Sequence, residues 1–352
     1  MILALAFISS AVSCSAKSAI LIEAASGEIV YEKNAYEKLP MASTTKIMTA
    51  LVAIEQCDLS QTVTIPSDAV GIEGSSLYLK EGEKLTMLQL LYGLMLQSAN
   101  DAAVAIAIEC AGSVDDFAVL MNQKASELGL KNTHFSNPNG LDEEDHYTTA
   151  YDLAQLTAYA LKNETFAKIV STYKYDIGDR IVVNHNKLLQ TYEGACGVKT
   201  GFTKRSGRCL VSAAERNGVK LICVTINDGD DWRDHSSLLD YGFTQYKCVE
   251  LCDVGSLVYE LDCTGGVKDK IKASNRDKLS VTVKSDESTI NCIVETKGTS
   301  LLFCPIEKDT VLADAVFYKD GAVIARIPLY ASETVMAKEF KKSIWDYLNI
   351  FS

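Results

Sequence analysis

Residues 40–54 read Pro-Met-Ala-Ser-Thr-Thr-Lys-Ile-Met-Thr-Ala-Leu-Val-Ala-Ile, which places a Ser-x-x-Lys motif directly before an apolar run. The run Ile47–Ile54 has the length and composition of a buried helix. We therefore expect Ser43 at the start of this helix and Lys46 on the same face, one turn later. For the isolated motif, the alternative is a capping serine followed by a solvated lysine.

Two further short motifs follow in the chain, Ser98-Ala99-Asn100 and Lys199-Thr200-Gly201. A Ser-x-x-Lys motif alone is a weak signal, because Ser171-Thr172-Tyr173-Lys174 repeats it in a setting that suggests only solvated surface. Together, the three motifs supply a nucleophile, an amine, a polar Ser/Asn pair and a second cation. The set therefore indicates nucleophilic chemistry at Ser43.

A serine hydroxyl is a poor nucleophile until a neighbouring base takes its proton. Lys46 can be that base if burial or a nearby cation lowers its pKa from about 10.4 toward neutrality, and Lys199 is a candidate for that cation. The N–H groups and the positive dipole end at the start of a helix suit a developing oxyanion. The motifs thus predict an acyl-enzyme mechanism that needs no histidine. The four histidines are interpreted as structural or surface residues: His134, His146, His185 and His235.

The motifs and their surroundings resemble those of the low-molecular-mass penicillin-binding proteins, the serine-type D-alanyl-D-alanine carboxypeptidase family. The resemblance covers roughly residues 18–245 and is carried by five segments: Pro40–Ala50, Leu94–Ala103, Asn137–Asp142, Thr148–Ala154 and Gly197–Thr203. It implies a transpeptidase/β-lactamase-like domain of the α+β class. It also implies removal of the terminal D-alanine from peptidoglycan stem pentapeptides, with β-lactams as covalent inhibitors and no cofactor.

The resemblance assigns catalytic roles to residues of the motifs. It implies that Ser43 forms the acyl ester, that Lys46 accepts the serine proton, and that Ser98 relays a proton toward the leaving group. The backbone N–H groups of Ser43 and Phe202 would form the oxyanion hole.

The same resemblance assigns substrate-binding roles. Asn100 would hold the substrate amide, and Lys199 and Thr200 would meet the terminal carboxylate. Gly201 would allow close approach of the backbone. Arg208 is a further candidate for carboxylate binding, with a surface arginine as an equal alternative.

The pattern of the chain predicts an antiparallel sheet packed on helices, with strands at both ends of a helical middle. Ala19–Ile22 and Glu28–Tyr31 flank Ser26-Gly27 as the strands of a hairpin would. The expected helices lie at about 43–56, 86–97 and 99–111, and the expected later strands at 198–200, 208–213 and 220–226.

The chain has 352 residues and a formal net charge of −12, which argues against a nucleic-acid ligand. Its length allows two domains, and we expect a catalytic domain at 17–246. From Lys247 the helical patterns stop, Leu279–Val283 alternates strictly, and Asp320-Gly321 separates two apolar runs as a hairpin turn does. Residues 247–330 are therefore predicted to form a small all-β domain.

The first 16 residues resemble a secretory signal peptide, because an apolar run from Ile2 to Val12 precedes small residues. Cleavage is expected near Ala16, although no Lys or Arg precedes the run. The alternatives are a lipoprotein cleavage site at Cys14 and a buried N-terminal strand. The expected location is the outer face of the cytoplasmic membrane.

Residues 333–352 carry an apolar helical stripe, including Phe340, Ile344 and Leu348, with three lysines nearby. The segment is too short and polar to span a bilayer, and it suits an amphipathic helix on the membrane surface. The alternative is a helix docked on its own protein.

The chain has 11 cysteines, of which ten follow the expected leader. They can pair in an oxidising compartment or serve as buried thiols, and the sequence does not give their connectivity. Cys248 and Cys252 have loose metal-ligand spacing, but no His or second Cys pair completes a zinc site. No metal is therefore expected.

Three rival functions stay open beside the carboxypeptidase. A β-lactamase needs a base for fast deacylation, and the segment Glu164–Lys168 lacks the Glu-x-x-x-Asn pattern of class A enzymes. A peptidoglycan endopeptidase would differ in pocket shape, which the sequence does not reveal. A non-catalytic wall-binding sporulation protein would keep the fold without turnover.

Overall fold

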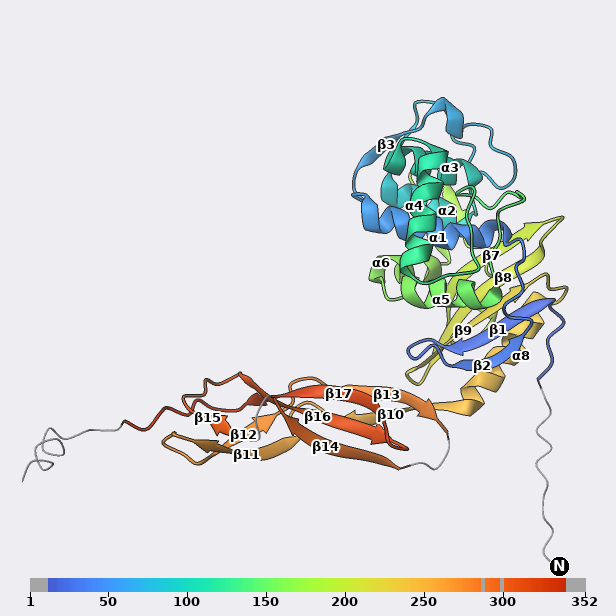
Figure 1. The fold of residues 1–352 in the computed structure, drawn as a ribbon. Helices are drawn as coiled ribbons and strands as arrows, with labels where there is room; N and C mark the ends of the chain where they lie inside the picture. Colours follow the sequence, from blue (N-terminus) through green and yellow to red (C-terminus); the bar gives the residue numbers. More distant parts are fainter. Residues whose placement is uncertain (1–11, 286–288, 298–300, 340–352) are drawn as a thin grey trace, which may run out of the picture. The chain divides into compact units, whose positions relative to one another are not determined.

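The computed structural model describes residues 12–285, 289–297 and 301–339. The chain forms two compact units that divide between Tyr246 and Lys247 (Figure 1). Among the described residues, none of the helices combines the length and the apolar character needed to cross a bilayer.

Unit 1 contains the predicted antiparallel sheet, which has five strands in the order β2-β1-β9-β8-β7. Its strands are β1 (Ser18–Glu23), β2 (Ile29–Lys33), β7 (Ala195–Thr203), β8 (Gly207–Arg216) and β9 (Val219–Ile226). The first two strands form the expected hairpin. In sequence the sheet is split between the two ends of the unit, because the helical middle lies between β2 and β7.

The helices of unit 1 pack on this sheet and on one another (Figure 1). They are η1 (Ala42–Thr45), α1 (Lys46–Gln56), η2 (Ser67–Ala69), α2 (Met87–Leu96), α3 (Asn100–Ala111), α4 (Val114–Glu127), α5 (Ala150–Ala160), α6 (Glu164–Ser171), α7 (Leu188–Thr191) and α8 (Asp231–Gln245). Two short strand pairs accompany them, β3 (Thr62–Thr64) with β4 (Lys84–Thr86) and β5 (Lys174–Asp176) with β6 (Ile181–Val183).

Strand β9 is largely apolar, and both of its faces are covered. Ile222 and Val224 join the main core beneath the helices, whereas the alternate residue Thr225 faces α8, where its hydroxyl meets Nε2 of His235 at 2.9 Å. Both faces of the strand are therefore covered, which removes the polar alternation of a half-exposed strand.

Unit 2 is the predicted all-β domain. Its six-stranded sheet has the order β14-β16-β17-β12-β11-β15, and β10 pairs with β13. The strands are β10 (Tyr246–Cys252), β11 (Val258–Thr264), β12 (Lys270–Ser274), β13 (Leu279–Lys284), β14 (Ile290–Thr296), β15 (Leu302–Phe303), β16 (Val311–Lys319) and β17 (Ala322–Ala331). The expected Asp320-Gly321 turn joins β16 and β17.

The expected helix at 333–352 is wrong for residues 333–339, which are extended. Val335 is fully buried and exchanges two backbone hydrogen bonds with Ile306, with N···O distances of 2.9 and 2.8 Å. A helix cannot offer its backbone to a neighbouring strand, so tertiary pairing overrides the local pattern here. The rest of the expected helix, residues 340–352, lies outside the described residues.

The end of the expected leader packs against unit 1. Ala16 is fully buried, and the Ser15 hydroxyl donates to Oδ2 of Asp234 at 2.7 Å. Residues 1–11 lie outside the described residues.

Helix α4 offers a test of the packing of unit 1. Phe117 is fully buried in the core, whereas Val119 on the same helix is 54% exposed. Phe117→Ala is expected to lower the free energy of unfolding of unit 1 by about 3–5 kcal/mol, because it leaves a cavity. Val119→Ala should change it by less than about 0.5 kcal/mol. Denaturant unfolding measures both variants, and equal effects would contradict this account of the core.

Candidate active site

Ser43 lies in the short helix η1, directly before α1. The hydroxyls of Thr44 and Thr45 donate to the carbonyl oxygens of Met41 and Ala42, at 2.6 and 2.8 Å, which fixes the turn. The turn leaves Ser43 partly exposed at the mouth of a cavity, while α1 runs into the core.

Lys46 is fully buried and its amine meets three oxygen acceptors. Nζ donates to Oγ of Ser43 at 2.9 Å, to Oδ1 of Asn100 at 2.7 Å and to the carbonyl of Asn139 at 2.5 Å. None of these acceptors is a carboxylate. The amine is therefore held in place by neutral groups, within hydrogen-bond distance of the serine hydroxyl.

The electrostatics of the site favour the uncharged form of Lys46. Burial lowers its pKa well below the usual value, Lys199 lowers the pKa further, and Asp101 opposes them. Lys199 is almost fully buried, and burial lowers its pKa to about 7. Its Nζ donates to the carbonyl of Thr200 at 2.8 Å.

Ser98 lies between α2 and α3 and adopts a left-handed conformation with φ +60°, and Asn100 is the first residue of α3. The side chain of Asn100 is engaged at both ends, by Lys46 and by the carbonyl of Glu73, to which Nδ2 donates at 2.5 Å. In this arrangement Asn100 positions Lys46, and contact with a substrate amide would require Nδ2 to leave Glu73.

Strand β7 brings Lys199-Thr200-Gly201 against the start of α1. A Cβ at Gly201 would lie 3.1 Å from N of Ser43 and 3.2 Å from N of Thr44, so a side chain would push the strand and the turn apart. Because β7 is the last strand of the sheet, its outer edge is open to an extended ligand.

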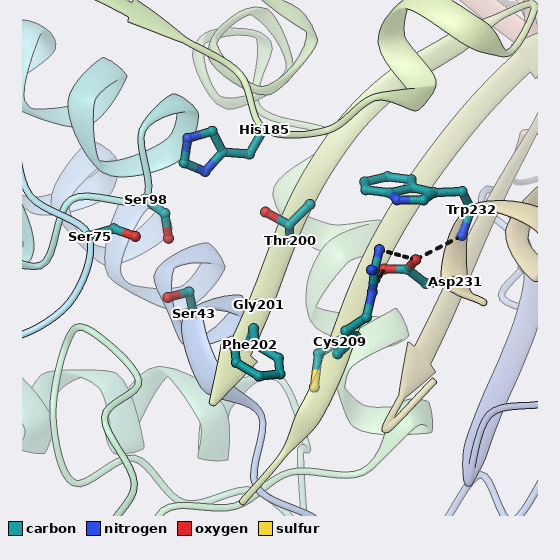
Figure 2. A pocket seen from close by; sticks show the side chains of 11 residues that line it. Ser43, Ser75, Ser98, His185, Thr200, Gly201, Phe202, Cys209, Asp231 and Trp232 are labelled. Atoms are coloured by element: carbon teal, nitrogen blue, oxygen red, sulfur yellow. Dashed lines mark hydrogen bonds and ion pairs between the residues drawn. The ribbon is translucent and has the colours of Figure 1, made fainter. Parts of the chain in front are cut away.

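These residues border a cavity of about 440 Å³. Figure 2 shows Ser43 and Ser98 facing each other across it, with Thr200 on the β7 side. The cavity is lined by Ser43, Ser75, Ser98, His185, Thr200, Gly201, Phe202, Arg208, Cys209, Asp231 and Trp232. The predicted residues Lys46, Asn100 and Lys199 do not line the cavity, but they form hydrogen bonds with the lining residues Ser43, Ser75 and Thr200, respectively.

Four contributions to the site were missed in the sequence. Asp101 accepts hydrogen bonds from N of Leu77 and N of Leu79, both at 3.0 Å, and so fixes the loop beside the cavity. The second contribution is the carbonyl of Asn139. The only sequence signal for it was that Asn139 belongs to the segment 137–142, which carries part of the family resemblance. His185 is a third, because it lines the cavity instead of lying apart from the site.

The fourth is the wall made by Asp231 and Trp232, which meets the predicted candidate Arg208. Nη2 and Nε of Arg208 donate to Oδ1 and Oδ2 of Asp231 at 2.5 and 3.1 Å. The guanidinium of Arg208 lies 5.8 Å from the centre of the Trp232 ring. Two N–H donors of the Arg208 guanidinium are therefore occupied by Asp231 and do not point to a substrate carboxylate.

Two of the other histidines are structural. Nε2 of His146 lies 2.7 Å from Oγ1 of Thr45, beneath the turn that carries Ser43, and burial lowers its pKa to about 4. His235 bridges β8 and β9, and burial lowers its pKa to about 3. Both are neutral at pH 7.

Comparison with models of known protein families gives a match in each unit. A family model described as D-alanyl-D-alanine carboxypeptidase matches residues 6–230, and one described as the C-terminal domain of penicillin-binding protein 5 matches residues 246–337. The chain is similar to the D-alanyl-D-alanine carboxypeptidases DacF of Bacillus subtilis, 35% identical over 92% of this chain and 87% of that protein, and DacA of Escherichia coli, 31% identical over 95% and 87%.

Solved structures of similar fold include penicillin-binding protein 5 from Haemophilus influenzae, with a TM-score of 0.69 at 28% identity over 92% of this chain and 98% of that one. The D-alanyl-D-alanine carboxypeptidase DacD from Francisella tularensis gives a TM-score of 0.65 at 26% identity over 93% and 95%.

The buried Lys199 makes stability depend on pH. Its pKa is about 7 in the folded chain and about 10.5 when unfolded, so between these values the unfolded chain binds one more proton. Stability therefore rises with pH across this window, by up to about 1.4 kcal/mol per pH unit for one proton. Lys199→Met should remove this contribution and stabilise the protein more at pH 7 than at pH 10.

Unfolding free energies measured from pH 7 to 10 test this expectation. The exposed Lys204→Met is the matched control and should leave the slope unchanged. A slope that is the same in the parent and in Lys199→Met would refute the linkage.

Proposed function

The chain belongs to the D-alanyl-D-alanine carboxypeptidase family, as its motifs predicted, and on that premise we propose that it hydrolyses stem pentapeptides through an acyl ester on Ser43. It is a serine-type hydrolase with D-Ala-D-Ala carboxypeptidase activity.

The contact that carries this proposal is the 2.9 Å hydrogen bond between Nζ of Lys46 and Oγ of Ser43. An uncharged Lys46 takes the serine proton as Oγ attacks the carbonyl of the penultimate D-alanine. The N–H groups of Ser43 and Phe202 stabilise the oxyanion. The proton then passes through Ser98 to the departing amine of the terminal D-alanine, and water hydrolyses the ester in a second step.

Substrate binding is assigned to the open edge of β7. An extended peptide can pair with this edge, which holds the scissile bond beside Ser43. Thr200 and the ammonium form of Lys199 provide the donors for the terminal carboxylate. Because the pKa of Lys199 lies at about 7, a bound carboxylate would favour its charged form.

The rival β-lactamase function lacks a base for deacylation at the expected place. Glu164 begins α6, is exposed and does not line the cavity that holds Ser43. A penicilloyl ester on Ser43 would then persist, so β-lactams act as inhibitors of this enzyme. The endopeptidase function shares every step of the mechanism and differs only in the amine that leaves.

We further propose that the protein is exported and acts at the outer face of the cytoplasmic membrane. The apolar run at residues 2–12 supports export, and the apolar and basic residues at 340–352 support contact with the membrane surface. This place would bring the enzyme to the peptidoglycan that contains its substrate.

The nucleophile is tested with the two Ser-x-x-Lys motifs of the chain. Ser43→Ala is expected to abolish both D-alanine release from a D-Ala-D-Ala pentapeptide and covalent labelling by a fluorescent penicillin, because no oxygen is left to form the ester. Ser171→Ala, in the exposed second motif, should leave both unchanged. Labelling retained in Ser43→Ala would refute the assignment of the nucleophile.

Membrane contact is tested by ending the chain after Glu339, which keeps the buried Val335 in unit 2. The full chain should co-sediment with vesicles that contain anionic lipid, and the shortened chain should stay in the supernatant with unchanged labelling by penicillin. Co-sedimentation of the shortened chain would show that residues 340–352 are not the anchor.

A further inference from the structure

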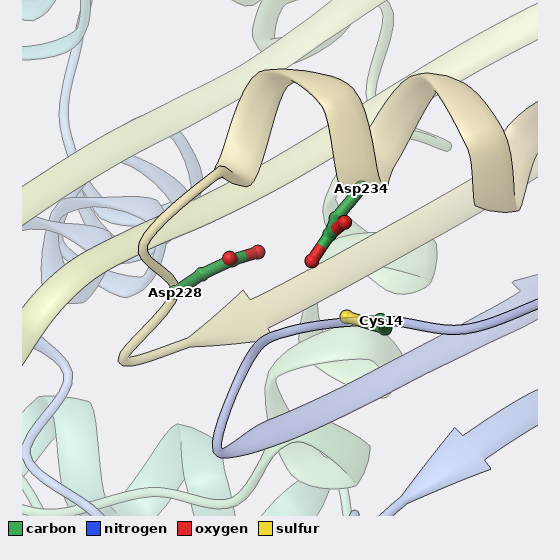
Figure 3. A group of neighbouring side chains, drawn as sticks. All are labelled: Cys14, Asp228 and Asp234. Atoms are coloured by element: carbon green, nitrogen blue, oxygen red, sulfur yellow. The ribbon is translucent and has the colours of Figure 1, made fainter.

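Three buried side chains with possible ligand atoms meet on the side of the sheet that α8 covers. Asp228 follows β9, Asp234 lies on the first turns of α8, and Cys14 belongs to the segment that precedes β1. One ligand atom from each lies within 4.8 Å of the other two. Figure 3 shows the two carboxylates pointing toward each other, with the sulfur of Cys14 beside them.

One atom of this cluster has no partner. Oδ1 of Asp228 accepts hydrogen bonds from the Ser15 hydroxyl and from N of Asp230, each at 3.0 Å. Oδ2 of Asp228 is buried, and it has no hydrogen-bond partner among the described residues. Since the residue is only 2% exposed, water does not solvate this oxygen freely.

The cluster also lacks a balancing cation. No ion pair joins Asp228 or Asp234 to a described Lys or Arg. At the edge of the cluster, Nζ of Lys33 donates to the carbonyl oxygen of Cys14 at 2.7 Å. The exposed Arg233 pairs with Asp230 instead, with 3.7 Å between Nη1 and Oδ2. Buried carboxylates without a positive partner are costly, which favours an additional cation at this place.

We propose that Cys14, Asp228 and Asp234 bind a zinc ion, with water as the fourth ligand. One thiolate and two carboxylates fit a divalent cation of borderline softness, and three protein ligands with one water is an established zinc geometry. Zinc bonds of about 2.0–2.3 Å require small side-chain rotations to close the present separations. The segment lines a surface cavity of about 420 Å³ together with Asp234, which provides a path for the ion.

Binding is coupled to proton release. A thiol must lose its proton before its sulfur can bind a metal ion. Zinc displaces the thiol proton, and any proton on Asp228, to the solvent while the Zn–S and Zn–O bonds form. Affinity should therefore increase with pH.

A zinc ion at this site would hold part of the wall of the catalytic cavity in place. The turn from Asp228 to Asp234 also contains Asp231 and Trp232, which line that cavity. A bound ion would tie this turn to the segment before β1. The proposal also requires the mature chain to retain Cys14, so leader cleavage would lie before this residue and not near Ala16.

The test uses the exported protein, isolated from its native compartment. Mass spectrometry reads the N-terminal residue, and elemental analysis after equilibration with equimolar zinc reads the metal content. We expect a chain that includes Cys14 and holds one zinc ion. Cobalt in place of zinc should add a thiolate-to-cobalt absorption band in the near ultraviolet, which only a cysteine ligand produces.

Variants assign the ligands. Cys14→Ser and Asp228→Asn should weaken zinc binding by at least about 10- to 100-fold, the loss caused even by changing an outer partner of a metal ligand. Cys196→Ser and Asp230→Asn are the matched controls, because these groups lie outside the cluster, and they should retain the ion. Circular dichroism verifies that each variant is folded.

Three results would overturn the proposal. The first is a mature chain that begins after Cys14, and the second is a folded protein that holds no zinc, in which the two carboxyl groups share a proton instead. The third is equal zinc binding in the parent and in Asp228→Asn. None of them bears on the acyl-enzyme mechanism, because Ser43 can be labelled with penicillin in the same samples.

Discussion

A buried lysine whose three hydrogen-bond acceptors are all neutral is the constraint on which the rest of unit 1 depends. The amine of Lys46 is surrounded by a hydroxyl, an amide oxygen and a backbone carbonyl. Neutral acceptors hold its position without stabilising its charge, as a carboxylate would. Burial and the nearby Lys199 then favour the free amine that can accept a proton. Replacing one acceptor with an acid would keep the geometry and remove the base.

The fold meets this constraint by joining distant segments at one place. Helix η1 provides Ser43, α1 provides Lys46, the start of α3 provides Asn100, and the loop after α4 provides Asn139. Gly140, with φ +89°, follows in that loop, and a Cβ there would collide with the carbonyl of Ala42. The edge strand β7 closes the site from the other side. Glycines are therefore required where two backbones meet around the nucleophile.

On the opposite side of the sheet, the buried groups without a charged partner are acidic instead of basic. Asp228 and Asp234 are buried carboxylates near a buried thiol, and they lack a cation among the described residues. In the catalytic site, the unpaired charge is avoided by loss of a proton from lysine. Here, the proposed zinc ion would supply the missing positive charge. The turn that joins Asp228 to Asp234 also contains Asp231 and Trp232, which line the cavity beside Ser43.

The sequence by itself determined most local elements of unit 1 and the placement of Ser43 and Lys46 one turn apart at the start of a buried helix. Periodicity and the spacing of Ser43 and Lys46 follow from residues within one or two turns, so they can be read without a fold. Only the tertiary structure decided which distant groups surround them, including the Asn139 carbonyl and the pairing of Arg208 with Asp231. It also made residues 333–339 extended, because Val335 pairs with Ile306 instead of continuing a helix. The physical reason is that helical periodicity is a property of neighbours in the chain, whereas strand pairing, burial and charge depend on partners that folding brings together.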